Sequence, residues 1–195
     1  MVRNVAKSLT LNNYNIVGKK IDVDINIIKE NLDIEDIIIK NFVVNDEIIT
    51  LLNKCKKLNR IVLINCDIKN NIKLKRICIL ELINCSINNS SIFADSMDHL
   101  TIDCCDKIDI SYIKNLKIQI LKIIDTKVLN LNIIDEIITL KYLYLIGIKL
   151  NENINYEKLI KLKELNLSYS EILNKEAYLK QFKNKKIKVT FETKE

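Results

Sequence analysis

The feature that most constrains this chain is an internal repeat of about 22 residues. An eleven-residue pattern, apolar-x-x-apolar-x-apolar-x-x-Cys/Asn/Thr-x-apolar, fits residues 58–68 and 77–87 at every position. Related segments are 6–16, 34–44, 97–108, 118–128, 140–150, 162–172 and a truncated strand at 187–189. A chain rich in isoleucine and leucine produces isolated matches by chance, but not nine in register, so the repeat determines the predicted fold.

The first inward residue of each predicted strand marks the period of the repeat. Successive spacings are 28, 24, 19, 20, 21, 22, 22 and 22 residues. In proteins with repeats of about 20–29 residues, each unit contributes one short strand and stacks on its neighbours. The anchor residues are Leu9, Ile37, Ile61, Leu80, Leu100, Leu121, Leu143, Leu165 and Ile187.

The pattern has a direct physical meaning. Its apolar-x-apolar part places two side chains on one face of a short strand. The later position, held by Cys66, Cys85, Cys105 and Thr126, turns the chain inward, where a small polar group can hydrogen-bond the loop backbone. No unit can bury its apolar face alone, so neighbours are expected to stack into one continuous core. Nine strands at a spacing of about 4.8 Å predict a parallel sheet about 38 Å across.

Over nearly its whole length the chain resembles the leucine-rich-repeat family. Cys66, Cys85 and Cys105 are similar to the cysteine-containing subclass found in intracellular proteins. The resemblance implies an α/β solenoid, an arc with a concave parallel sheet of about nine short strands and short helical, 3₁₀ or extended convex segments. It also implies a protein partner on the concave face, although the motif is specific for fold and says little about function.

The repeats predict one leucine-rich-repeat domain over residues 1–195. The first repeat and an N-terminal cap are expected over 6–33, regular repeats over 34–172, and a C-terminal cap over 173–195. No linker or domain boundary interrupts this organisation.

The segments that return the chain from one strand to the next are expected to differ. Helical periodicity favours helices within 47–54 and 174–182. The returns at 68–77 and 87–97 are expected to be 3₁₀ or extended, because repeats of 19 and 20 residues leave little room for a helix.

The composition disfavours several classes of protein. The net charge is +6, from 31 basic and 25 acidic residues, and the basic residues are almost all lysine. Arginine and aromatic residues are scarce, so a solvated lysine coat is favoured and nucleic acid is disfavoured as a partner. The bias toward isoleucine, asparagine and lysine indicates an A/T-rich genome.

The chain is expected in the cytoplasm, with the nucleus as the alternative, and not to be secreted. Its N-terminus lacks the uninterrupted apolar segment of a signal peptide, and six cysteines then indicate reduced thiols. No apolar run approaches about 18 residues, so no membrane partner is expected.

The residues that could carry chemistry argue against an enzyme. His99 is the only histidine, so a catalytic triad or a histidine metal cluster lacks a second imidazole. The cysteines lack the paired spacing of metal sites and are expected to be small buried thiols, except Cys104, the candidate reactive thiol. Gly18 and Gly147, the only glycines, cannot build a phosphate-binding loop. We expect no catalytic residue, no metal site and no cofactor.

The concave face carries the functional hypothesis. A solvated sheet face alternates between apolar inward and polar outward residues, whereas several predicted outward residues here are isoleucine, valine or tyrosine. Contiguous exposed apolar surface marks interaction sites, and tyrosines are frequent anchors there. The predicted partner-binding residues, centred on the two tyrosines, are Ile38, Val62, Ile64, Glu81, Ile83, Thr101, Lys122, Ile124, Tyr142, Tyr144, Ile146 and Asn166.

Three alternatives remain open. The apolar outward residues can reflect compositional drift toward isoleucine instead of an interface. The lysine coat can bind nucleic acid or another acidic surface, or the arcs can self-assemble into a structural protein. The basic C-terminus, with Lys183, Lys185, Lys186 and Lys188, can touch an acidic partner, but a solubilising cap is favoured.

Overall fold

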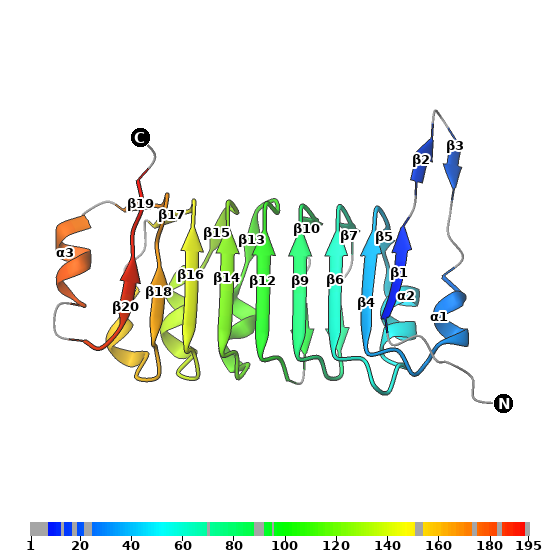
Figure 1. The fold of residues 1–195 in the computed structure, drawn as a ribbon, viewed down its shortest axis with the longest axis horizontal. Coiled ribbons are helices and arrows are strands. Elements are labelled where there is room, and N and C mark those ends of the chain that lie inside the picture. Colours follow the sequence, from blue (N-terminus) through cyan, green and yellow to red (C-terminus); the bar gives the residue numbers. More distant parts are fainter. Residues whose placement is uncertain are drawn as a thin grey trace.

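Nine parallel strands form the main sheet of the molecule (Figure 1). The computed structural model describes residues 8–12, 14–16, 19–21, 25–69, 71–87, 92–94, 96–150, 154–172, 175–182 and 185–193. Gly18, Lys183 and the first two residues of segment 6–16, all referred to above, lie outside these residues. The fold is α/β, mostly parallel sheet with few helices. The strands are β1 (Ser8–Asn12), β4 (Asp36–Lys40), β6 (Arg60–Ile64), β9 (Ile79–Ile83), β12 (His99–Asp103), β14 (Ile120–Ile124), β16 (Tyr142–Ile146), β18 (Glu164–Asn166) and β20 (Lys188–Thr190).

The strands follow one another across the sheet in the order of the sequence. Their register aligns the predicted anchors, from Leu9 opposite Ile37 to Leu143 opposite Leu165. The last predicted anchor is wrong, because Leu165 lies opposite Val189 and Ile187 precedes β20. The final interval is therefore two residues longer than the repeat pattern predicts.

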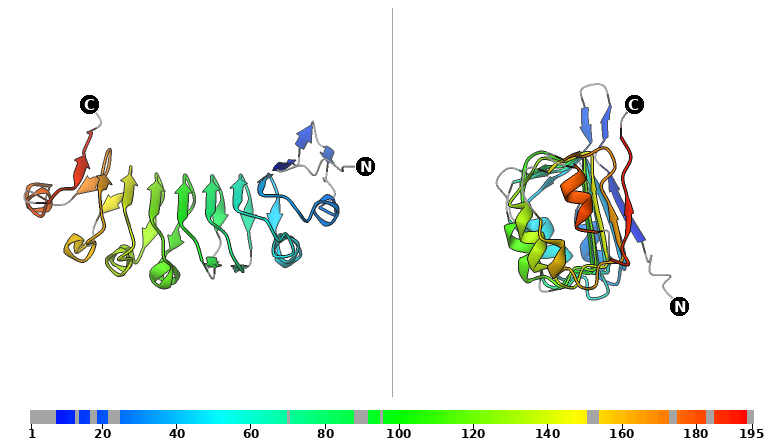
Figure 2. Two further views of the ribbon diagram at one scale, coloured as in Figure 1. Left: turned by 60° about the horizontal axis from the view of Figure 1, so that its bottom comes forward. Right: turned by 90° about the vertical axis from the view of Figure 1, so that its left-hand side faces the viewer.

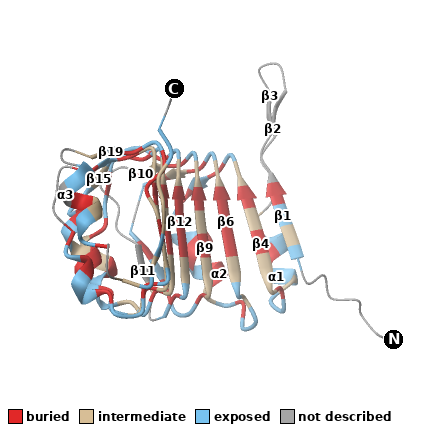
Figure 3. Cartoon of the chain, turned by 60° about the vertical axis from the view of Figure 1, so that its left-hand side comes forward, coloured by how far each residue is buried: buried red, intermediate tan, exposed pale blue. Residues whose placement is uncertain are grey.

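Buried and half-buried residues alternate along the strands, as Figure 3 shows. In β4, β9, β14 and β16 the second and fourth residues are buried and the other three are half-buried. The buried residues belong to one continuous core that runs from Leu11 at one end to Phe182 at the other. Stacking of the repeats therefore buries the apolar face of each strand, as the pattern predicts.

A tight turn follows each long strand from β4 to β16. The first residue of the turn has a positive φ, a conformation that asparagine, aspartate and glycine adopt more readily than other residues. The residues at this position are Asn41, Asn65, Asn84, Cys104, Asp125 and Gly147. The requirement for this backbone shape explains why asparagine recurs after the strands.

The next residue of the turn points into the core. Cys85 Sγ donates to Leu63 O at 3.4 Å, and Thr126 Oγ1 donates to Ile124 O at 2.8 Å. In a later repeat Ser170 Oγ donates to Leu145 O at 2.7 Å. Thr126 Oγ1 and Ser170 Oγ also accept from the turn amides of Cys105 and Ile148, each at 3.1 Å, so the prediction that a small polar group here satisfies loop backbone is confirmed.

The return segments form a second layer behind the main sheet. Figure 2 shows the strand row on the inner side of a shallow arc and the helices on the outer side. Short parallel pairings link neighbouring returns. They join β5 (Val43–Val44), β7 (Asp67–Ile68) and β10 (Ser86–Ile87); β8 (Ile72–Leu74) and β11 (Ile92–Ala94); β13 (Ile108–Asp109) and β15 (Val128–Leu129); and β17 (Lys149–Leu150) and β19 (Glu171–Ile172).

The predicted conformations of the returns are confirmed where the structure describes them. Helices α2 (Asp46–Leu52) and α3 (Lys175–Lys180) lie in the two segments with helical periodicity. Asn45 caps α2, since its side chain accepts from Ile48 N. The two short returns are extended at β8 and β11. Three longer returns are 3₁₀ helices, η1 (Ser111–Asn115), η2 (Leu131–Glu136) and η3 (Tyr156–Lys158).

The two ends of the array differ from its middle. Near the N-terminus, α1 (Ile27–Glu30) lies in the predicted cap, whereas an antiparallel hairpin of β2 (Tyr14–Ile16) and β3 (Lys19–Ile21) was not predicted. Near the C-terminus, Tyr156 contacts Tyr178 and Phe182 edge-on, at centroid distances of 5.4 and 4.8 Å. Within the described ranges, no helix is long and apolar enough to cross a membrane.

Candidate interaction face

The side of the main sheet that faces away from the core carries three rows of side chains. We name the amino, middle and carboxyl rows after the strand positions that the register aligns. The amino and middle rows take one residue from each of the nine strands, and the carboxyl row takes one from each long strand from β4 to β16. The amino row is Ser8, Asp36, Arg60, Ile79, His99, Ile120, Tyr142, Glu164 and Lys188. The middle row is Thr10, Ile38, Val62, Glu81, Thr101, Lys122, Tyr144, Asn166 and Thr190. The carboxyl row is Lys40, Ile64, Ile83, Asp103, Ile124 and Ile146.

The sheet brings all twelve predicted partner-binding residues onto this one face. Seven lie in the middle row, namely Ile38, Val62, Glu81, Thr101, Lys122, Tyr144 and Asn166. Ile64, Ile83, Ile124 and Ile146 lie in the carboxyl row, and Tyr142 lies in the amino row. The repeat register was therefore sufficient to group them correctly.

Two of the twelve residues are not accessible, which corrects the sequence analysis. Val62 is 3% exposed and Thr101 is 8% exposed, although both point away from the core. Arg60 Nε donates to Glu81 Oε1 at 2.8 Å, and Glu81 lies directly opposite Val62. The Arg60–Glu81 ion pair therefore lies beside Val62, and the face is less apolar than the strand pattern predicts.

The other predicted residues are half-buried. None of them is among the most exposed large apolar side chains of the described residues. The isoleucines of the carboxyl row thus present a partial apolar surface along the ends of β6, β9, β14 and β16. This surface is interrupted at β12, where Asp103 holds the equivalent position.

A chain of polar contacts fixes Tyr144 on this face. Lys122 Nζ lies over the Tyr144 ring, 5.3 Å from its centroid. On the other side, burial and then the Glu164 carboxylate raise the pKa of the Tyr144 hydroxyl. Glu164 also pairs with Lys188 at 3.5 Å. The Tyr144 side chain therefore lies between a cation on β14 and an anion on β18.

On β12 all three outward residues are polar, and the first of them is His99. Its Nε2 lies 3.0 Å from Thr101 Oγ1, within hydrogen-bonding distance. Burial, and then the positive charge of Lys122, lower the pKa of His99. The imidazole is accordingly neutral near pH 7, and its Nε2 is engaged with a neighbouring hydroxyl on the same strand.

The inward cysteines are packing residues of the turns. Cys66, Cys85 and Cys105 are all buried, as predicted. The Cys105 thiol lowers the pKa of Cys85, but Cys66 and burial outweigh it and raise that pKa to about 11. The hydrogen bond with Cys85, and then burial, also raise the pKa of the Cys105 thiol. In the part of the chain that the structure covers, no group of three potential metal ligands occurs.

Cys104 is exposed, as expected of a candidate reactive thiol, but its surroundings disfavour the thiolate. A hydrogen bond with Asp103, then burial and the charges of Asp103 and Asp125, raise its pKa. The thiolate is the reactive form of cysteine, so these carboxylates reduce its reactivity. Exposure was foreseeable from the strand pattern, whereas the electrostatic environment was not.

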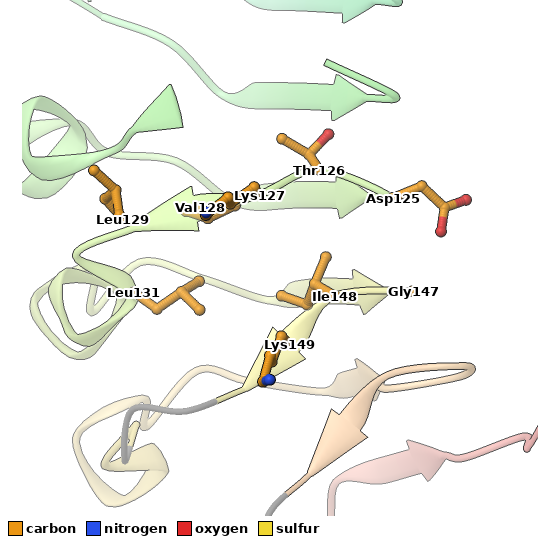
Figure 4. Close-up of a pocket in the computed structure, with 9 residues that line it drawn as sticks. All are labelled: Asp125, Thr126, Lys127, Val128, Leu129, Leu131, Gly147, Ile148 and Lys149. Carbon is orange, nitrogen blue, oxygen red and sulfur yellow. The ribbon is translucent and has the colours of Figure 1, made fainter. Parts of the chain in front are cut away.

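A cavity of about 570 Å³ lies away from the face, where the ladder of short strands is interrupted (Figure 4). The short strand β15 pairs with β13, and β17 pairs with β19, but the described strands β15 and β17 do not pair with each other. In Figure 4, Leu129 and Leu131 lie at one end of the cavity and Asp125 and Gly147 at the other. The repeat pattern contains no signal for this interruption, and the sequence analysis missed it.

Comparison of the chain with protein-family models, with curated proteins and with solved structures gave no match. The functional argument therefore depends on the geometry of the molecule.

Proposed function

We propose that this chain is a leucine-rich-repeat solenoid, a single domain over residues 1–195, that binds a protein partner on the outward face and catalyses no reaction. The repeat architecture is supported by nine strands that pair in sequence order, with the predicted anchors aligned from Leu9 to Leu165. We place this function in a reducing compartment, the cytosol or the nucleus, where free thiols such as Cys66 and Cys85 persist.

The observation that carries the proposed interface is the placement of Tyr144 between Lys122 and Glu164. A side chain held between Lys122 and Glu164 loses less conformational freedom on binding than a mobile one. Tyr142 lies on the same face two residues earlier, and Ile124 and Ile146 lie opposite each other in the carboxyl row. Rigid aromatic residues with apolar neighbours and polar surroundings are typical of protein interaction hot spots.

The central experiment is affinity purification with the Tyr142→Ala/Tyr144→Ala double variant as bait. We expect the variant to lose the protein captured by the wild type, with an affinity reduced about thirtyfold or more. Circular dichroism and thermal melting of the same sample measure whether the fold is intact. A folded variant that still captures the protein contradicts the proposed interface.

Two further variants make the result specific. Tyr169→Asn removes a 44% exposed tyrosine at the carboxyl end of the sheet, outside the three rows. Residue 169 has a positive φ, which the introduced asparagine tolerates. It is expected to bind normally. Tyr144→Phe keeps the ring and removes the hydroxyl, so it separates ring packing from the contact with Glu164. If the double variant unfolds, Tyr144→Phe and Tyr142→Ala tested singly still measure the interface.

A further inference from the structure

All nine strands of the main sheet are parallel, so the turns that lead into them lie along one edge of the molecule, the lower edge in Figure 1. We call this line of turns the amino edge and define it by residues 31–35, 53–59, 75–78, 96–98, 116–119, 137–141, 159–163 and 185–187. It contains three acidic residues, Asp33, Glu35 and Asp98. Its eleven basic residues are Lys54, Lys56, Lys57, Lys75, Arg76, Lys117, Lys141, Lys161, Lys163, Lys185 and Lys186. This excess of positive charge is larger than that of the whole chain, +6.

The positive charge of the amino edge is mostly not neutralised by the protein itself. Lys57 pairs with Asp33 at 3.5 Å, and Lys141 donates to the neutral Gln119. Among the described residues, none of the other nine basic side chains makes an ion pair. The amino edge therefore presents a line of charge that is available to an anionic partner.

Two isoleucines on the amino edge are the most exposed large apolar side chains of the described residues. Ile160 is 80% exposed and Ile138 is 56% exposed. They occupy the same position of two successive turns, because Ile138 N donates to Glu136 O and Ile160 N donates to Lys158 O. The next strands of these two repeats are paired neighbours, so the two isoleucines project from adjacent places on the edge.

A second cavity of about 570 Å³ brings the exposed Ile160 together with lysines of the amino edge. Ile160 lines it together with Leu159, Leu162 and Ile187. Five lysines, and a single acidic residue, Glu157, complete the lining. The lysines are Lys141, Lys161, Lys163, Lys185 and Lys186. Exposed apolar groups and unpaired cations therefore meet at one end of the amino edge.

The combination distinguishes between two kinds of anionic partner. A nucleic acid backbone uses lysines, but it gains nothing from exposed isoleucines, and its bases prefer aromatic side chains. An anionic lipid bilayer uses both, because its headgroups attract lysines and its interface accepts apolar side chains. Because the turns of the amino edge lie in a line, several of them can contact a flat surface at the same time.

We propose that the C-terminal part of the amino edge binds the surface of an anionic lipid bilayer, with Ile138 and Ile160 inserted at the headgroup level. The lysines around the second cavity pair with lipid phosphates and carboxylates. The sequence-based expectation of no membrane partner considered apolar spanning segments, whereas this association is peripheral. The proposal concerns a different surface from the outward face and does not depend on the protein interface there.

Vesicle flotation with the full chain tests the proposal. Wild type is expected to float with vesicles of three parts phosphatidylcholine to one part phosphatidylserine, and not with phosphatidylcholine alone. Ile138→Ser/Ile160→Ser is expected to lower the apparent affinity about tenfold or more. Lys161→Gln/Lys163→Gln/Lys186→Gln is expected to have a comparable effect that added salt reduces, because only the lysine contribution is screened.

Matched controls come from the segments that follow the carboxyl ends of the strands. Val43→Ser changes a 43% exposed apolar residue, and Lys127→Gln/Lys149→Gln changes two exposed lysines, all outside the amino edge. These variants are expected to bind vesicles as the wild type does.

Absence of wild-type binding to the anionic vesicles overturns the proposal. So does binding that the lysine variant weakens and the isoleucine variant does not. Tighter binding of a single-stranded DNA oligonucleotide, independent of both isoleucines, assigns the edge to nucleic acid instead.

Discussion

The two long edges of the main sheet are built from the same repeat but use their side chains differently. At the carboxyl end of the strands, Asn84 Nδ2 donates to Asn65 Oδ1 at 2.8 Å and Asn65 Nδ2 donates to Asn41 Oδ1 at 3.2 Å. At the amino end, most lysines have no partner within the described residues. Side-chain hydrogen bonds therefore link neighbouring turns at the carboxyl edge, whereas most lysines of the amino edge remain available to a partner.

The difference follows from the geometry of the chain. After a long strand the backbone reverses within a few residues through a positive φ, which restricts the residue types and draws the next side chain inward. The turns that enter the strands have no such column of positive φ values, and only every third or fourth residue is buried there. Sequence freedom, and with it the room for function, lies where the backbone is less constrained.

The largest expected effect comes from the core that both edges share. Leu143→Ala and Leu165→Ala are each expected to destabilise the fold by ~2–5 kcal/mol, because both side chains are fully buried. Lys186→Ala on the amino edge is expected to change stability by less than about 0.5 kcal/mol. Denaturant midpoints measure this contrast, and equal effects at Leu165 and Lys186 would contradict the register.

Substitution at Gly147 tests whether the carboxyl edge is constrained by its backbone. Gly147 has a φ of +64°, and an added Cβ would overlap Asp125 Oδ1. Gly147→Ala is expected to cost ~1–2 kcal/mol, whereas Ile138→Ser on the amino edge stays within about 0.5 kcal/mol. Asp125→Gly, which removes the overlapping side chain and tolerates the positive φ of position 125, is expected to recover in the Gly147→Ala background the part of the loss that the overlap causes. Complete recovery would mean that the backbone conformation costs nothing.

Thiol labelling tests whether the carboxyl turns direct their side chains inward. Cys104 is expected to react first, and Cys66, Cys85 and Cys105 slowly, because the last three are buried. Asp103→Asn is expected to accelerate labelling of Cys104 near neutral pH, because it removes the main cause of its raised pKa. The acceleration should vanish at a pH high enough to ionise the thiol in both proteins. Rapid labelling of all three buried cysteines would show that these turns open readily.

The smallest expected effect concerns His99, at the amino end of β12. Its pKa is lowered in the folded state by burial and Lys122, so the unfolded chain binds the proton more tightly. The contribution of His99 to the free energy of unfolding is therefore fully present above about pH 6.5. It is lost as the pH falls from there toward the lowered pKa. His99→Gln is expected to flatten this part of the curve of unfolding free energy against pH. An unchanged slope would assign the pH dependence to the carboxylates.

The sequence was informative where one repeat position has one physical role. The anchors from Leu9 to Leu165 and the inward cysteines occupy positions that every unit must fill, so their alignment predicted the sheet and its register. The last anchor failed because the spacing to Val189 exceeds the repeat by two residues.

The accessibility of the outward face was less predictable. Val62 has the strand position of an exposed residue, but it is 3% exposed and lies beside the ion pair that Arg60 forms with Glu81 on the neighbouring strand. Such contacts between side chains are not encoded in a pattern of apolar and polar positions. The amino edge, in contrast, had a usable signal, because aligning the residues four and five places before each anchor reveals Lys56, Lys57, Lys75 and Arg76 on adjacent units.

The common direction of the nine strands sets the geometry of a bound complex. If the amino edge rests on a bilayer, the strand axes stand close to the membrane normal. The amino row then lies nearest the lipid, and the carboxyl row lies four residues, about 13 Å, farther into the water. A protein on the outward face would be held upright beside the bilayer, at a height determined by the row it contacts. Moving its contacts from Tyr142 to Ile146 along β16 would raise it by that distance.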